Sequence, residues 1–300
     1  MDPLSQLLST LKVQANIFHN GQYCGNWALD TSGSNHISFH VVTHGDCYLK
    51  VDDTDSIKLE TGDMVVFPHD SRHCISGAPY SNQQLNEEVS EGLDVLKDDG
   101  TGLVCGYFEH QNPLVKNITK PLPSYIVIRY CSENPSVING VQSLMIQESL
   151  YSHDSNKANH GGSTAELVLN KLAECLLALL FRDELPVETG VLAAMGHPRL
   201  RLAIDAVHER PDKKWTLEEL ASLCSMSRAA FSKLFKDVVG QTPMEYLLYW
   251  RITLAYRLLA DEKVTTLEAA LKCGYENESS FSKVFKRIVG IGPGAVRSPL

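Results

Sequence analysis

The chain has 300 residues and a formal net charge of -9 at pH 7, with 27 Lys and Arg against 36 Asp and Glu. This charge argues against a generally nucleic-acid-binding surface, and 43% hydrophobic residues suit two globular domains. No apolar run of about eighteen residues and no basic, apolar leader is present, so we expect no membrane contact, no secretion signal and a cytoplasmic location. The eight cysteines should then be mostly reduced.

Short β-branched and aromatic runs dominate the segment from Ile37 to about Val127. Ile37–Val42 and Met64–Phe67 are examples, and Gly, Asp and Pro residues separate the runs. Many short strands at close intervals are typical of a β-sandwich or barrel. We therefore expect residues 1–135 to form a β-barrel domain.

Histidines are concentrated in the N-terminal part, with nine of the eleven before residue 196. His36, His40 and His44 cannot bind one ion, because four residues of strand span about 13 Å and metal–nitrogen bonds are only about 2 Å long. His40 and His73 remain the candidate pair. Either they line an effector pocket or have a structural role, or they bind a metal ion. We predict no bound metal and no cofactor.

Three cysteines are candidates for redox sensing, namely Cys24, Cys74 and Cys105. Cys74 follows His73, and a charged imidazole close to the thiol would lower the pKa of that thiol. The alternative is that these cysteines are small buried hydrophobes, which is the commoner role of a reduced cysteine. We expect that role for Cys175, Cys224 and Cys273.

Residues 136–185 carry two helical patterns, Val141–Leu150 and Ala165–Phe181. The second pattern has more apolar surface than one barrel should bury. It is therefore expected to form the seam of a homodimer, and packing on the barrel is the alternative. Residues 186–196 contain a proline and two glycines and are predicted to be a linker.

The C-terminal region contains a repeat with an offset of fifty residues, in which Phe231–Pro243 returns as Phe281–Pro293. In each copy apolar residues fall at i, i+3, i+4 and i+7, which predicts a helix. Ser227 and Asn277 precede these helices as N-caps. A shorter helix is expected before each one, so the repeated unit is helix, tight turn, helix, which is suited to a DNA major groove.

The outward faces of the two repeated helices carry short or cationic side chains that suit base edges and phosphates. An ordinary solvated helix face is the alternative, but the same register in both copies favours DNA. Charge agrees, because residues 196–300 hold 16 basic and 12 acidic residues, a net charge of +4, while residues 1–195 have a net charge of -13. The outward residues are Arg228, Ser232, Lys233 and Lys236 in the first copy, and Asn277, Ser279, Ser282, Lys283 and Lys286 in the second.

Residues 197–297 resemble the DNA-binding domain of the AraC/XylS family of bacterial transcription regulators. The resemblance is carried by Trp215–Ala221, Met226–Ser232 and Cys273–Phe281. It implies two helix-turn-helix units joined by a long helix over about Pro243–Ala260, in a domain that we place at 197–300. It also implies double-stranded promoter DNA and RNA polymerase as partners, with activation as the mode and repression as the alternative. By position, it suggests base contacts from Ala229, Ser232 and Lys233, and from Glu278, Ser279, Ser282 and Lys283.

The N-terminal part resembles a cupin. The pattern Gly62-Asp63-x-x-x-x-Pro68-x-x-x-x-His73, preceded by Phe39-His40-x-x-x-x-Gly45, is similar to the cupin-type sensor domain of one AraC-family branch. The implied fold is α+β, with an N-terminal cupin-like β-barrel with flanking helices and a C-terminal all-α domain of two helix-turn-helix units. The implied signal is an oxidant or a small molecule. A metal-dependent cupin enzyme is the alternative, but the His-x-His pair of such enzymes is missing here, so we expect no enzyme.

Overall fold

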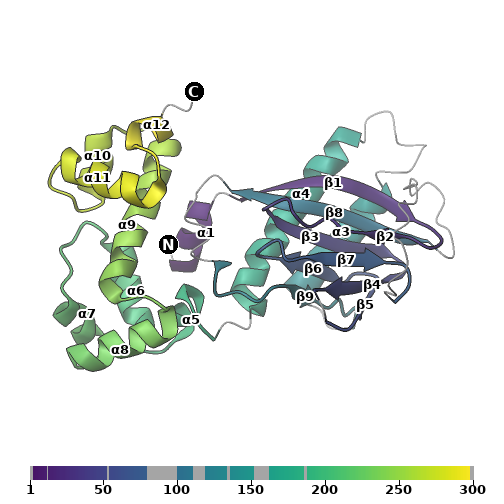
Figure 1. Ribbon diagram of the computed structural model, residues 1–300, viewed down its shortest axis with the longest axis horizontal. Coiled ribbons are helices and arrows are strands. Elements are labelled where there is room, and N and C mark those ends of the chain that lie inside the picture. The colour runs from purple at the N-terminus through teal and green to yellow at the C-terminus, as the bar shows by residue number, and fades with distance from the viewer. Residues whose placement is uncertain are drawn as a thin grey trace. The chain divides into compact units, whose positions relative to one another are not determined.

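The computed structural model describes residues 3–11, 13–52, 54–79, 100–110, 119–133, 136–151, 162–185 and 188–297. Contacts divide the chain into two compact units. One consists of Val13–Glu109 and Leu122–Leu185 and contains all the strands in Figure 1. The other consists of Met1–Lys12, His110–Pro121 and Pro186–Leu300, and its elements are helices.

The strand-containing unit is built from two sheets. The first has the order β1 (Val13–Tyr23), β8 (Thr101–His110), β3 (Ile37–His44), β6 (Met64–Phe67), β9 (Ile126–Ile128). The second has the order β2 (Ala28–Leu29), β7 (His73–Ser76), β4 (Asp46–Val51), β5 (Ile57–Glu60). β3 pairs in antiparallel fashion with both β6 and β8, and β4 does so with both β5 and β7. This is the cupin-like architecture that the sequence predicted.

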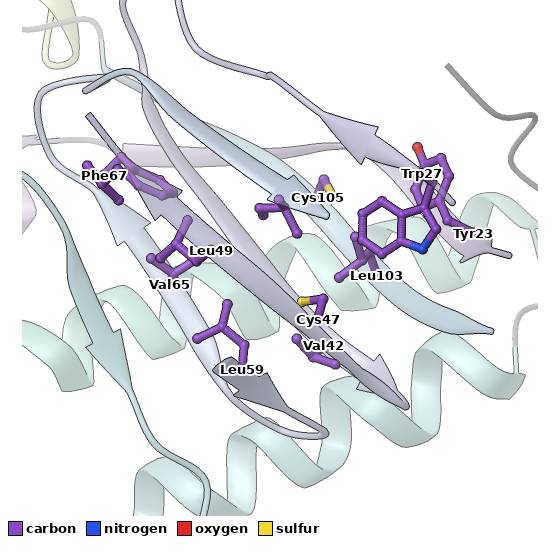
Figure 2. Close-up of a cluster of buried hydrophobic side chains, with 12 residues drawn as sticks. Tyr23, Trp27, Val42, Cys47, Leu49, Leu59, Val65, Phe67, Leu103 and Cys105 are labelled. Atoms are coloured by element: carbon purple, nitrogen blue, oxygen red, sulfur yellow. The ribbon is translucent and has the colours of Figure 1, made fainter. Parts of the chain in front are cut away.

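Side chains from both sheets form the core of this unit (Figure 2). Along β4, Cys47, Leu49 and Val51 are buried and alternate with more exposed residues, as expected for a strand with one face on the core. Phe67 of the first sheet is fully buried in the same cluster. Burying each large apolar side chain contributes about 1.5–3 kcal/mol, so this cluster is a main source of stability for the unit.

Asp63 of the Gly-Asp motif has a structural role. Its side chain is almost fully buried and accepts hydrogen bonds from the backbone N–H groups of Glu60 at 3.0 Å and Tyr130 at 2.9 Å. Arg129 also donates to it, at 2.6 Å. The motif therefore ties the turn before β6 to the segment that follows β9.

Two helices complete this unit, α3 (Val137–Tyr151) and α4 (Gly162–Leu179), and a π-helical turn follows at Leu180–Glu184. α4 packs on α3 and β1, and α3 packs on β3. Leu169, Ala173 and Leu176 of α4 are buried within the unit. Packing on the barrel and on α3 therefore accounts for much of the apolar surface that suggested a dimer seam on this helix.

The second unit contains the predicted tandem of helices. In chain order these are α5 (Val191–Gly196), α6 (Leu200–Glu209), α7 (Leu217–Leu223), α8 (Arg228–Val239), α9 (Pro243–Ala260), α10 (Thr266–Lys272), α11 (Glu278–Val289) and α12 (Pro293–Arg297). α9 has the bounds predicted for the joining helix. It carries α7 and α8 towards one end and α10 to α12 towards the other (Figure 1).

Two boundaries differ from the sequence prediction. Residues 186–196 were expected to be a linker, but Val191–Gly196 is helix α5, which packs on α6 and α8. Helix α1 (Pro3–Leu11) was assigned to the barrel domain, yet it packs on α5, α6 and α9. Leu7 of α1 is 3% exposed. The contacts therefore place α1 with the C-terminal helices. Among the described residues, none of the helices is long and apolar enough to cross a membrane.

Candidate nucleic-acid interface and polar cluster in the barrel

The two repeated helices, α8 and α11, are fixed in the same way. The Ser227 side chain accepts a hydrogen bond from the N–H of Ala230 at 3.3 Å, and the Asn277 side chain accepts one from the N–H of Ser280 at 2.9 Å. Both helices end at a glycine in the left-handed conformation, Gly240 or Gly290. The predicted N-caps are thus confirmed, and the glycines are typical helix ends.

Paired phenylalanines set the orientation of each helix. Phe231 and Phe235 of α8 are at most 1% exposed, and Phe281 and Phe285 of α11 are fully buried. Because these residues hold one face of each helix on the core, the opposite face is turned to solvent. The predicted helical period is therefore confirmed in both copies.

All eleven candidate contact residues lie at the surface of the unit. Ser232 and Ser282 are half-buried, and the others are exposed. The exposed candidates are Arg228, Ala229, Lys233 and Lys236 on α8, and Asn277, Glu278, Ser279, Lys283 and Lys286 at the start and along the length of α11. Arg287 of α11 is also exposed. Arg287 was not among the predicted contact residues, although it lies four residues after Lys283 and so at a neighbouring position on the helix surface.

Two of these side chains already have partners. The Arg228 guanidinium forms an ion pair with Glu218 of α7 at 3.0 Å, and both groups are largely exposed. The Asn277 carbonyl oxygen is used as the N-cap of α11. An exposed ion pair contributes at most about 1 kcal/mol, so Arg228 can exchange Glu218 for a phosphate at small cost.

Capping boxes begin the helices that support α8 and α11. Thr216 with Glu219 and Thr265 with Glu268 form reciprocal hydrogen bonds at the starts of α7 and α10, as the Thr-x-x-Glu spacing favours. A third box joins Thr242 and Glu245 at the start of α9. This third box was not predicted, although it has the same Thr-x-x-Glu spacing.

A polar cluster lies inside the barrel unit, where His40 of β3 and His73 of β7 meet. Their Nε2 atoms are 3.2 Å apart, and the Thr31 hydroxyl is 3.1 Å from the first and 2.9 Å from the second. Both histidines are at most 2% exposed, and the ring of Phe67 stacks on His73 with centroids 3.7 Å apart. The predicted pair therefore converges. Thr31 was missed because it lies in an irregular segment without a motif.

Both imidazoles in this cluster are neutral at pH 7. Burial lowers the pKa of His40 well below its usual value, and the nearby His73 lowers it further. Burial also lowers the pKa of His73. The Nδ1 of His73 lies 2.8 Å from the carbonyl oxygen of Ser71, so it carries the proton and donates it there. The Nε2 lone pair of His73 is thus directed at Thr31 and His40.

A metal ion is the alternative occupant of the same cluster. Two nitrogens 3.2 Å apart are close enough to share one ion with bonds of about 2.0–2.1 Å. In the described part of the chain, however, no group of three His, Cys, Asp or Glu side chains is arranged to hold a metal. The donor set is two imidazoles and a hydroxyl, which falls short of the usual set of a metalloenzyme.

The candidate redox cysteines differ in accessibility. Cys105 on β8 is 1% exposed and burial raises the pKa of its thiol, whereas Cys24 is half-buried. Burial also raises the pKa of the half-buried Cys74, so the expectation that His73 would lower it is wrong. The physical reason is that the neighbouring imidazole is neutral. Cys47 was missed, and it lies in the same buried cluster as Cys105.

The expected structural cysteines are confirmed in part. Cys224 and Cys273 are buried in the second unit. Cys175 is exposed on α4, so its assignment as a buried hydrophobe is wrong. The error arises because the helix is apolar around much of its circumference, and the sequence alone does not show which side faces the barrel.

Comparison with known proteins agrees with both units. A cupin family model matches residues 2–185, and a helix-turn-helix domain model matches residues 220–298. An AraC-like transcription regulator of Streptomyces antibioticus is 28% identical over 99% of this chain and 98% of its own length. The chain belongs to the AraC-like transcription regulators with an N-terminal cupin domain. This AraC-like regulator is accordingly a DNA-binding protein.

Two further proteins are similar to this AraC-like regulator. The RCS-specific HTH-type transcriptional activator RclR of Escherichia coli is 28% identical over 99% of this chain and 97% of its own length. The crystal structure of the DNA-binding domain of AdpA, in complex with a target DNA, is 28% identical. The match covers 34% of this chain and 91% of the AdpA domain chain, with a TM-score of 0.32.

Proposed function

We propose that this regulator binds promoter DNA through both helix-turn-helix units, and that a signal received in the cupin-like domain controls the binding. The observation that carries the proposal is the equivalence of α8 and α11. Both are N-capped and held by two buried phenylalanines, and both carry an outward serine and two outward lysines at equivalent positions. Each suits one segment of the major groove.

The outward side chains divide into two roles. Lys233 and Lys283 occupy equivalent positions near the first turns of their helices, where recognition helices approach base edges. A lysine there suits the O6 and N7 atoms of guanine. Lys236 and Lys286 lie one turn further along and suit phosphates, whose contacts position the protein without reading sequence.

Selection from a random-sequence duplex library tests this part of the proposal. The wild-type protein should enrich a sequence with two recognised segments, and Lys233→Ala combined with Lys283→Ala should abolish the enrichment. Lys263→Ala is the matched control, because it removes an exposed lysine from the same unit outside α8 and α11. Failure of the wild-type protein to enrich any sequence would overturn the proposal.

The polar cluster of Thr31, His40 and His73 is the proposed effector site. Ligand sites combine apolar walls with a few placed polar groups, and this cluster supplies such polar groups inside an apolar core. In the neutral state the cluster offers a hydroxyl donor and imidazole lone pairs. A small molecule with both acceptor and donor groups fits this chemistry.

The chain connections supply a route from this site to the DNA-binding helices. His40 pairs in register with Cys105 of β8, so a change at His40 acts directly on β8. In the sheet β8 lies next to β1. The chain passes from β8 into His110–Pro121, and it enters β1 from Met1–Lys12. Both of these segments belong to the other unit. A ligand that shifts β8 or β1 can therefore bias the packing of α1 on α5, α6 and α9.

Native mass spectrometry and metal analysis of the purified protein test the effector site. We expect a small molecule to be retained by the wild-type protein and lost from His73→Ala, with a change in DNA affinity. Unchanged DNA binding in both His40→Ala and His73→Ala under all conditions would contradict the proposal. Stoichiometric iron would instead favour the enzymatic alternative. The kinship with transcription regulators supports a non-enzymatic role.

Control by thiol oxidation is the second candidate. It is favoured by the half-buried Cys24, which directly follows β1, and by the likeness to a relative named as an RCS-specific activator. Thiol mapping by mass spectrometry before and after mild oxidant tests it, with DNA binding measured on the same samples. Oxidation of Cys24 or Cys105 should change DNA binding, and Cys24→Ser and Cys105→Ser should abolish the response. If neither Cys24 nor Cys105 reacts with the oxidant, control by thiol oxidation is excluded.

We place the homodimer seam on α3. Its exposed residues recur every three or four positions, at Val137, Gly140, Leu144, Gln147 and Tyr151. Val137, Leu144 and Tyr151 are 62%, 51% and 48% exposed and lie seven residues apart. Apolar side chains at this spacing form the seam of a helix pair, and a second copy of the chain supplies the matching stripe.

The proposed mode of regulation is activation of transcription through contact with RNA polymerase. In vitro transcription with purified polymerase tests this mode.

A further inference from the structure

Arg251 lies in the middle of α9 and holds the loop between α6 and α7. Its Nε donates to the carbonyl oxygen of Pro211 at 2.6 Å, and its Nη2 donates to the carbonyl oxygen of Lys213 at 2.8 Å. The guanidinium is half-buried. A planar fork of N–H donors suits this task, because two carbonyls are bound at once in a fixed geometry.

The loop that Arg251 holds is itself well ordered by its neighbours. Lys213 lies over the ring of Trp215 at 3.8 Å and forms an ion pair with Glu219 of α7 at 2.9 Å. The indole N–H of Trp215 donates to the carbonyl oxygen of Arg210 at 3.0 Å. Residues 210–216 therefore move with the first helix-turn-helix unit, since Thr216 is the N-cap of α7.

The turn of the second helix-turn-helix unit touches the same place. A Cβ atom on Gly274 would lie 2.6 Å from the carbonyl oxygen of Asp212 and 2.7 Å from Nη2 of Arg251. Gly274 lies in the turn between α10 and α11. Next to this contact, Lys214 of the loop forms an ion pair with Glu276 of the turn. The loop, Arg251 and the turn are thus in mutual contact.

This junction joins the two helix-turn-helix units at a second place, in addition to α9. A single connecting helix leaves the two ends free to bend relative to one another. A second attachment removes that freedom, and here Arg251 is at its centre. The Lys214–Glu276 pair alone is too exposed to do this, because both side chains are more than 70% exposed.

We propose that Arg251 is a positioning residue that fixes the separation and angle between α8 and α11, and so sets the spacing between the two DNA segments that the regulator accepts. The inference rests on the proposed contact of both units with DNA. One base pair moves a recognised segment by about 3.4 Å along the axis and rotates it by about 35°. When the junction holds α8 and α11 at a fixed separation and angle, the two helices cannot follow such a shift. Without the junction they can.

The test uses the full-length protein and the duplex that the wild-type protein selects from a random library. Affinity is measured for this duplex, for versions with one base pair inserted or removed between the two segments, and for a version with one segment scrambled. The variants are Arg251→Met, Arg251→Lys and the matched control Arg257→Met. Arg257 lies on the same helix, but the ion pair that it forms is with Glu262, which follows α9.

We expect the wild-type protein to lose about tenfold or more in affinity on insertion, which corresponds to about 1.4 kcal/mol. Arg251→Met should bind the selected duplex about tenfold more weakly but lose only about twofold on insertion, and its affinity for the one-segment duplex should match wild type. Arg251→Lys keeps one donor and should be intermediate. Arg257→Met should behave as wild type.

A wild-type spacing penalty in a folded Arg251→Met protein would overturn the inference. Equal loss on the one-segment duplex would also overturn it, because Arg251 would then contact DNA or support one unit alone. If Arg251→Met does not fold, judged by thermal melting, Arg251→Lys decides between the same outcomes. A wild-type protein without any spacing dependence would overturn the inference as well. A wild-type protein that binds the one-segment duplex as tightly as the selected duplex would instead refute the two-unit function itself, which is a different result.

Discussion

We predict that His208 of α6 makes the DNA-binding unit sensitive to acid. Its side chain is 4% exposed, stacks on Trp250 with ring centroids 3.6 Å apart and is hydrogen-bonded to the Tyr246 hydroxyl. Burial lowers its pKa from 6.5 to about 3. The folded unit therefore holds His208 neutral, whereas the unfolded chain protonates it below about pH 6.5.

The sign and size of the effect follow from this difference. Below pH 6.5 the unfolded state binds one more proton than the folded state, so stability falls as the pH falls, until the folded pKa is reached near 3. Each pKa unit corresponds to about 1.4 kcal/mol, so His208 removes about 2 kcal/mol of stability between pH 8 and pH 5. That is a large share of a typical total of about 5–15 kcal/mol.

Native-state hydrogen exchange with mass spectrometry measures this for each unit separately. The opening free energy is compared at pH 8 and pH 5, after correction for the intrinsic exchange rate, for peptides that cover α6 and α9. His208→Gln is the comparison variant, because glutamine can hydrogen-bond to Tyr246 and does not titrate. The wild-type protein should lose about 2 kcal/mol more than the variant over this range. The same pH dependence in both proteins would refute the reasoning.

Three further predictions concern α8, α3 and the braced junction. Lys233→Ala should weaken binding to the selected duplex by about 1–3 kcal/mol, while an equal loss on random DNA in the same titration would make Lys233 a phosphate contact. In sedimentation experiments Leu144→Glu should dissociate the dimer, whereas Leu167→Glu, on α4, should not. The reverse result would show that the dimer seam is on α4. Gly274→Ala should lower stability by well over 1 kcal/mol in urea unfolding, because its Cβ would clash with Arg251 and Asp212. Gly240→Ala, whose Cβ meets no atom of the structure within 4 Å, should cost only about 1 kcal/mol, and equal losses would contradict the close contact at Gly274.

The sequence predicted the elements whose signals are local. The spacing of Phe231 and Phe235 gives the face of α8, and the caps Ser227 and Asn277 give the starts of α8 and α11. The bounds of α9 were implied by the family resemblance, and local signals agree with them, since Thr242 and Pro243 begin the helix and its residues are good helix formers. The residues in these interactions lie within a few positions of each other, so the pattern of residue types along the chain predicts them.

Features that depend on distant segments were not predicted. Thr31 joins His40 and His73 only because an irregular segment folds over two strands, and no periodicity marks it. Helix α1 has a strong apolar face, but the sequence does not say which unit buries it. Arg251 contacts backbone carbonyl oxygens, which every residue has. The residue types in the loop therefore do not indicate these contacts.

Methylation protection on the selected duplex tests the central claim most directly. The account predicts two protected major-groove segments on one face of the DNA, about one helical turn apart. Lys233→Ala should lose protection in one segment and Lys283→Ala in the other. A single protected segment, or loss of the same segment in both variants, would contradict the claim that α8 and α11 each read DNA.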